Sequence, residues 1–193
     1  MAIDLDGAPN AYGPPDTHPL DNELNAHDKK TGEIAGYLTK SDRRTPVLQG
    51  PNDPFPGYYV STTKFVDKSN PKKSDPRKYV DASKINYVVW GKFAIANGAM
   101  PGDFVAVYSK KTGKSVFGII GDSGNPSGAE GSMALLKALN YPVKNKNSGV
   151  DEKEIVIRYF PGSNPQHHFF KIQEQLDQEA AMLGLSKDFP SYK

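Results

Sequence analysis

The sequence predicts a single, mainly β domain with peripheral helices, spanning residues 1–193. Five segments are rich in β-branched and aromatic residues, and each is bounded by Gly, Pro, Asn or Asp, which is typical of short strands. The chain contains 18 glycines and 16 prolines, a content that favours short elements and turns over a helical bundle. A chain of this length can bury its own core without metal ions or disulfides.

The expected strands lie mostly in the second two-thirds of the chain. Residues 110–113 are expected to form a hairpin turn. Residues 1–57 are rich in proline and are expected to be largely loop, with short strands only at 3–6 and 33–38. The remaining predicted strands are 58–63, 85–90, 104–108, 115–120 and 155–160.

Two helices complete the expected fold. The first covers about 132–139 and ends before Pro142. The second covers about 165–183, within a C-terminal extension over 164–193, with Ser163 or Asn164 as cap and Gly184 as stop. Helical spacing gives this second helix an apolar face, which we expect to pack against the sheet rather than bind a partner. That face consists of Phe169, Ile172, Leu176, Ala180 and Leu183.

Composition and charge exclude several functional classes. Without cysteine the chain cannot form a disulfide or use a thiolate. The net charge of +2 is too small to favour nucleic acid as a partner, and no apolar run is long enough to span a membrane. Residues 64–92 hold a local basic excess, which is either a solvated loop face or a contact for an anionic polymer. Its cations are Lys64, Lys68, Lys72, Lys73, Arg77, Lys78, Lys84 and Lys92.

The first residues do not indicate the compartment in which the protein acts. Met1 is followed by Ala-Ile-Asp-Leu-Asp-Gly, without the basic and apolar regions of a signal peptide. Three interpretations stay open: a cytosolic protein, export without a cleaved signal, or a chain that begins after one.

The segment from Gly118 to Leu139 carries the most specific chemical signal. A β-branched strand enters a glycine-rich turn that holds Asp122 and Glu130, and an apolar helix follows. Hydrolysis of a glycosidic bond requires such a carboxyl pair, one to protonate the leaving oxygen and one to handle water or attack the sugar. The alternative is a surface turn with two solvated acids.

The surroundings of the two acids suggest different roles. Glu130 is expected just before a helix, where the positive end of the helix dipole favours a charged carboxylate. Asp122 follows Phe117, Ile119 and Ile120, whose bulk is expected to desolvate it and raise its pKa. Asp122 is therefore the expected acid and Glu130 the expected base.

Other chemistries lack their residue patterns, and we expect no metal and no cofactor. His167 and His168 are adjacent and diverge on a helix, whereas zinc sites commonly use histidines at i and i+4. Asp4 and Asp6 resemble the start of a calcium loop whose later ligands are missing. Neither a phosphate-binding Gly-Lys-Ser/Thr motif nor a Gly-x-Ser-x-Gly elbow is present.

Several segments resemble family 75 of the glycoside hydrolases, the fungal-type chitosanases. The resemblance covers roughly residues 3–163 and is most specific around the two acids. The similar segments are Asp4-Leu-Asp6-Gly7-x-x-Asn10-Ala, Tyr79-Val-Asp-Ala-x-x-Ile85-x-Tyr87-Val-Val, Gly118-Ile-Ile-Gly-Asp122-Ser-Gly, Gly128-x-Glu130-x-Ser132-x-x-Leu135 and Gly149-x-Asp151-Glu-Lys-Glu-Ile155.

This resemblance implies a fold and a set of site residues. It implies a six-stranded double-psi-like β-barrel and an inverting endo-hydrolase of β-1,4-linked glucosamine polymers, acting outside the cytoplasm on a polysaccharide. Asp122 and Glu130 would be the essential pair, with Asp6 as a third catalytic candidate. The residues expected to bind substrate are Asp4, Asn10, Tyr12, Ser123 and Ser132.

Two alternative functions stay open. Chitosan is a polycation, whereas this chain is mildly basic, so the glycan strand of peptidoglycan remains a candidate substrate. The chain would then be an antibacterial toxin of the same fold, with an immunity protein as partner. The other alternative is a non-catalytic carbohydrate-binding module that uses Tyr58, Tyr59, Trp90 and Tyr108 as stacking rings.

Overall fold

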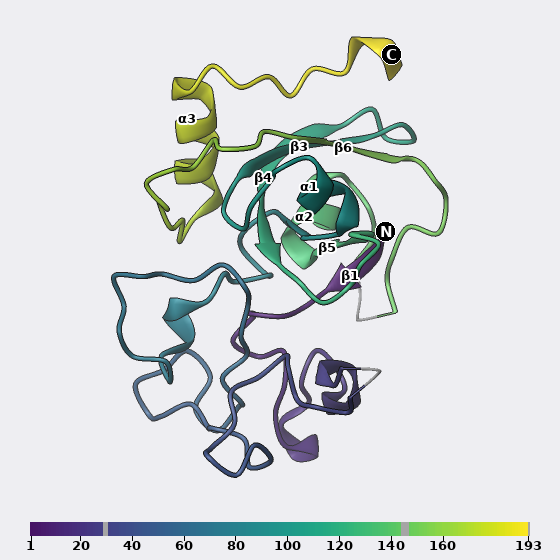
Figure 1. Cartoon of the computed structure of the whole chain (residues 1–193). Helices are drawn as coiled ribbons and strands as arrows, with labels where there is room; N and C mark the ends of the chain where they lie inside the picture. Colours follow the sequence, from purple (N-terminus) through teal and green to yellow (C-terminus); the bar gives the residue numbers. More distant parts are fainter. Residues whose placement is uncertain (29–30, 144–146, 193) are drawn as a thin grey trace.

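The computed structural model describes residues 1–28, 31–143 and 147–192, and its central element is a six-stranded sheet (Figure 1). The strands are arranged in the order β1-β5-β2-β4-β3-β6. Their bounds are β1 Ala2–Asp4, β2 Tyr87–Val89, β3 Phe104–Ser109, β4 Ser115–Asp122, β5 Glu130–Ser132 and β6 Ile155–Tyr159.

The strands run in both directions. β1 pairs with β5 in parallel, and β2 pairs with β4 in parallel, with Val89 beside Asp122 after a shift in register. β3 pairs antiparallel with both β4 and β6. The hairpin turn between β3 and β4 is confirmed, because the Gly113 N–H donates to the Ser109 carbonyl and Gly113 has a φ of 69°. β1 ends at Asp4, and β4 ends at Asp122.

The sheet is not closed into the barrel that the resemblance implied. Among the described residues, β1 and β6 occupy the two edges of the sheet, and β6 pairs only with β3. The backbones of Met1 and Val150 exchange hydrogen bonds, which brings the chain ahead of β6 to the β1 edge. This contact ends after a single bridge between Ala2 and Gly149, because β6 itself begins only at Ile155. The strands nevertheless curve around α1 (Lys92–Ala96) and α2 (Met133–Ala138) in Figure 1.

The helix after the glycine-rich turn is confirmed, and the C-terminal helix is shorter than predicted. Ser132 caps α2 by accepting from the Leu135 N–H at 3.1 Å. The C-terminal helix α3 is Gln173–Met182 and does not begin near residue 165. Two features break the helix there: His167 has a φ of 59°, and the Asn164 side chain bonds to the backbone of His168.

The predicted apolar face of the C-terminal helix is only partly buried. Leu176 and Ala180 are fully buried, and Phe170 enters the core from the segment before α3. Ile172 and Leu183 are each 49% exposed. Gly184, with a φ of 66°, follows the end of the helix as expected.

The first third of the chain is loop-rich, as expected, but its two predicted strands beyond β1 do not form. Residues 33–38 and 58–63 contribute isolated bridges only, including one between Tyr37 and Ser61. Tyr12, Tyr37 and Tyr59 pack their rings at centroid distances of 5.5 and 5.0 Å and hold these loops together. The short strand β5 and the helix α1 were not predicted.

Two apolar clusters flank the sheet. Along β3, Phe104, Ala106 and Tyr108 belong to one cluster, and Val105 and Val107 belong to the other. This alternation is the period of two that the sequence of β3 suggests. Among the described residues, no helix has the length and apolar character needed to cross a membrane.

Candidate functional site

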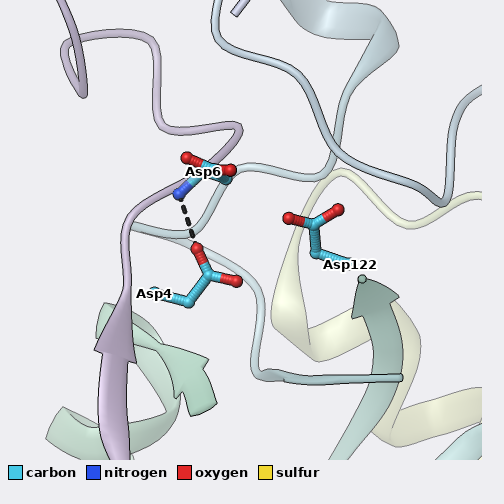
Figure 2. A group of neighbouring side chains, drawn as sticks. All are labelled: Asp4, Asp6 and Asp122. Atoms are coloured by element: carbon cyan, nitrogen blue, oxygen red, sulfur yellow. Dashed lines mark hydrogen bonds between the residues drawn. The ribbon is translucent and has the colours of Figure 1, made fainter. Parts of the chain in front are cut away.

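Three aspartates meet where β1 and β4 end. One carboxylate oxygen each from Asp4, Asp6 and Asp122 lies within 4.8 Å of the other two. Asp4 ends β1, Asp6 follows two residues later, and Asp122 ends β4. Figure 2 shows Asp4 and Asp122 rising from these strand ends, with Asp6 above them. The structure thus joins the two aspartates of the N-terminal motif to the acid of the glycine-rich segment.

A glycine and two hydrogen bonds fix the turn that carries Asp6. Gly7 has a φ of 80°, and a Cβ at this position would lie 1.9 Å from the carbonyl oxygen of Val80. A residue with a side chain would therefore push the turn away from its neighbour. The Gly7 N–H donates to Ser61 Oγ at 2.9 Å, and the Asp6 N–H donates to Asp4 Oδ1 at 2.9 Å.

Asp122 is held by backbone N–H groups from two neighbouring segments. The Lys64 N–H donates to Asp122 Oδ1 at 2.7 Å, and the Trp90 N–H donates to the Asp122 carbonyl at 2.7 Å. The preceding Gly121 leaves room for the ring of Tyr87, because a Cβ there would lie 2.5 Å from that ring. The Tyr87 hydroxyl donates to the Asp6 carbonyl at 2.9 Å and so ties the two halves of the site together.

Burial and mutual repulsion favour the protonated forms of the three aspartates. Burial is the main cause that raises the pKa of Asp4 to about 7, and the charge of Glu130 adds to it. Burial also raises the pKa of Asp6 well above its usual range, followed by the charges of Asp4 and Asp122. For Asp122, only 6% exposed, burial and then the charge of Asp4 raise the pKa well above its usual range. The sequence argument that Asp122 is desolvated is therefore confirmed.

Glu130 lies outside this cluster but acts on it. Its charge contributes to the raised pKa values of Asp4 and Asp122. Glu130 lies just before the helix, as expected: it opens β5, and Gly131 and the helix cap Ser132 separate it from Met133, the first residue of α2. Its side chain is held by Asn125, whose Nδ2 donates to Glu130 Oε1 at 2.9 Å.

Several members of the site were not predicted from the sequence. Asn125 and Tyr87 are joined to the acids through side-chain hydrogen bonds that only the folded chain reveals. Asp21 is a further carboxylate whose charge raises the pKa values of Asp4 and Asp6. The preferences of turn residues could have suggested Asn125, which lies in a Gly-Asn-Pro-Ser-Gly turn.

The predicted substrate-binding residues have different environments. Tyr12 is buried, and its hydroxyl donates to Asp6 Oδ1 at 2.6 Å, so it contacts the site from within the core. Ser132 is fully buried, and its Oγ donates to the Ile85 carbonyl and accepts the Tyr87 N–H, so it has a structural role. Asn10 is half-buried, whereas Ser123 is exposed directly beside Asp122.

The aromatic residues considered as a sugar-stacking surface are engaged in packing. Tyr108 is buried and stacks on Phe189 at 5.3 Å between ring centroids. Trp90 is half-buried, and its Nε1 donates to the Ala99 carbonyl at 2.7 Å. Tyr58 and Tyr59 are also half-buried. All four rings are therefore buried or half-buried.

The three aspartates also have the donor type that a hard cation prefers. Carboxylate oxygens at this mutual distance could share one Ca²⁺ or Mg²⁺ ion. The same crowding suits acid–base chemistry, in which the carboxylates share protons instead of a metal. The sequence expectation of no metal stays a prediction.

The basic stretch of residues 64–92 is partly neutralised. Arg77 pairs with Asp53 at 3.0 Å and Asp75 at 3.2 Å, and Lys84 pairs with Asp81 at 3.1 Å. A hollow of about 230 Å³ beside this stretch is lined by residues that include Arg77, Lys84 and Phe170, and none of the site acids lines it. The acid cluster and this hollow are therefore separate features.

A scan of the chain against models of protein families and a sequence comparison with curated proteins both find no match. The resemblance to family 75 of the glycoside hydrolases therefore stays a prediction.

Proposed function

We propose that this chain is a glycoside hydrolase that cleaves internal β-1,4 linkages in glucosamine polymers such as chitosan. The observation that carries the proposal is the buried Asp122 carboxyl facing Asp4 and Asp6 at the ends of two strands. An inverting reaction would use Asp122 as the acid and Glu130 as the base.

The environment of Asp122 supports the acid role. A general acid must carry its proton at the working pH, and burial raises the pKa of Asp122 well above its usual range. The carboxylates of Asp4 and Asp6 strengthen this effect because neighbouring carboxylates cannot all ionise together.

The close spacing of the three aspartates favours Glu130 as the base. Inverting enzymes separate their two carboxyls by about 6.5–9.5 Å so that a water fits between them. Asp4 and Asp6 each offer an oxygen within 4.8 Å of Asp122, which is shorter than this spacing. Glu130 lies outside that group yet close enough for its charge to affect Asp122, so it is the better partner for a water-mediated reaction.

The charge of the site supports a cationic substrate. The charges with the strongest influence on Asp4 are those of Glu130 and Asp21, and the strongest on Asp122 are those of Asp4 and Glu130. The carboxylates of Glu130 and Asp21 beside the cluster attract the ammonium groups of glucosamine even though the whole chain carries a net charge of +2.

The proposal is tested by incubating the protein with chitosan and measuring new reducing ends. Asp122→Asn should abolish cleavage and Glu130→Gln should lower its rate by about 10²–10⁴-fold, because each change keeps the shape of the side chain and removes one role. Glu174→Gln, an exposed change on α3, serves as the matched control and should retain full activity. Retained cleavage in both site variants would overturn the proposal.

One observation favours peptidoglycan as an alternative substrate. Lys64 donates its backbone N–H to Asp122 and exposes its side chain, which enters no ion pair found among the described residues. A cation beside the site would suit a glycan strand whose peptides carry carboxylates. Release of fragments from purified cell wall but not from chitosan, together with lysis on periplasmic expression, would identify this toxin-like function, in which an immunity protein is the expected partner.

A further inference from the structure

The loop between β4 and β5 holds Glu130 through a single amide side chain. Asn125 Nδ2 donates to Glu130 Oε1 at 2.9 Å. Among the described residues, the other oxygen of this carboxylate, Oε2, accepts no hydrogen bond. One oxygen of Glu130 is thus fixed by Asn125.

The orientation of the Asn125 amide is determined by its own loop. Its Oδ1 accepts the Ser127 N–H at 3.0 Å and the Ser127 hydroxyl at 2.7 Å. The backbone N–H can only donate, so the atom facing Ser127 must be the oxygen and the atom facing Glu130 must be the NH₂ group. The amide therefore presents a donor to the carboxylate.

The loop itself is closed by one of its own hydrogen bonds and is anchored to the start of α1. The Gly128 N–H donates to the Asn125 carbonyl at 3.0 Å, and the Lys92 N–H donates to the Pro126 carbonyl at 2.8 Å. Gly91 lies so close that a Cβ on it would be 2.4 Å from the Gly128 nitrogen. The two backbones are in direct contact where the chain passes from β2 to α1, and this contact limits movement of the loop.

From these contacts we propose that Asn125 is a positioning residue. Because its loop is held in place, the hydrogen bond from the Asn125 amide keeps the Glu130 carboxylate in one orientation, toward the attacking water. The inference rests on the proposed function, because it assigns Asn125 a role through the base of that reaction. The Asn125 amide is suited to this task because it is a neutral donor, which can hold the carboxylate without supplying a compensating charge.

Asn125→Asp is the sharpest test because it preserves the size of the side chain. An aspartate can still accept from Ser127, but it places a second carboxylate against Glu130 instead of a donor. We expect kcat on chitosan to fall by about 10- to 100-fold with KM nearly unchanged, since small misplacements of a reacting group have effects of this size. Ser127→Ala, which removes one bond to Oδ1 and leaves the contact with Glu130, should have a smaller effect.

A double-mutant cycle separates positioning from a general effect on the fold. In the Glu130→Gln background, Asn125→Ala should cause no further loss of the residual rate, because the residue through which it acts has lost its function. Equal losses of rate in both backgrounds would overturn the proposal. So would an unchanged kcat in Asn125→Asp.

A spectroscopic readout makes the contact measurable without turnover. In ¹⁵N-labelled protein, Glu130→Ala should shift the side-chain amide signals of Asn125, and the matched Glu174→Ala should not. Unchanged Asn125 signals in Glu130→Ala would overturn the positioning proposal. A shift in a protein that cleaves neither chitosan nor cell wall would support the contact and reject the proposed function, so the two failures are distinguishable.

Discussion

Replacing Asp4 with asparagine should make the folded protein more stable at pH 8 while damaging the site. Asp4 belongs to a crowded cluster in which burial, as the main cause, raises its pKa from 3.8 to about 7. The folded chain therefore binds this proton more tightly than the unfolded chain does. Stability is lost as the pH rises from about 4 to about 7, and the loss is complete above pH 7.

The size of the effect follows from the change in the pKa of Asp4 on folding. A pKa that rises by about three corresponds to about 4 kcal/mol of unfolding free energy. The other carboxylates of the cluster partly compensate, because they take up protons as Asp4 loses its own, so we expect about 2–4 kcal/mol. An asparagine oxygen can still accept the Asp6 N–H, so the turn that carries Asp6 keeps its hydrogen bond.

Urea unfolding with EDTA at pH 4, 6 and 8 measures this prediction. The difference in unfolding free energy between Asp4→Asn and the wild type should be near zero at pH 4 and should grow toward pH 8. Asp16→Asn, which changes an exposed aspartate on a short 3₁₀ turn, is the matched control and should show no such trend. A constant difference across this pH range would refute the electrostatic reasoning about the cluster.

Three further changes test the packing and the hydrogen bonds around the site. Gly121→Ala places a methyl group 2.5 Å from the ring of Tyr87 and should lower stability by about 1–3 kcal/mol, with loss of activity, as read from thermal unfolding and reducing-end assays. Ser132→Ala removes a buried helix cap and should cost about 1–2 kcal/mol while leaving KM for chitosan unchanged; a large rise in KM would restore its expected role in substrate binding. Tyr12→Phe removes the donor to Asp6 and should raise the pKa of Asp6 further, measured by ¹³C NMR of the carboxyl; a fall would contradict the hydrogen-bond assignment.

The elements that were predicted correctly are those whose residue pattern and boundary residues lie within the element itself. Alternating β-branched and aromatic residues identified β3, β4 and β6, and Ser132 marked the start of α2. The strand β5 was not predicted because it is only three residues long and contains a glycine. It forms because β1 and β2 supply its hydrogen-bond partners, which is a tertiary effect.

The C-terminal helix illustrates how loop chemistry overrides an apolar pattern. The spacing of Phe169 and Ile172 fits a helix, but Asn164 bonds to the backbone of His168 and His167 adopts a left-handed conformation. A side chain that competes for backbone hydrogen bonds delays the helix until Gln173.

The candidate site was only partly predictable for the same reason. Asp122 could be identified because apolar residues precede it and a glycine-rich turn follows. Its contact with Asp4 and Asp6 joins positions more than a hundred residues apart, and no local pattern encodes that contact. The N-terminal motif pointed to Asp6 only through the family resemblance, whereas the fold brings Asp4 into the same group.

The most direct test of the central claim is ¹H NMR of anomeric protons during early hydrolysis of defined glucosamine oligomers. An acid at Asp122 and a water-activating base at Glu130 predict that the α-anomer appears first from the β-linked substrate and that Asp122→Asn yields no product. Initial release of the β-anomer, or unchanged turnover in Asp122→Asn, would contradict the account.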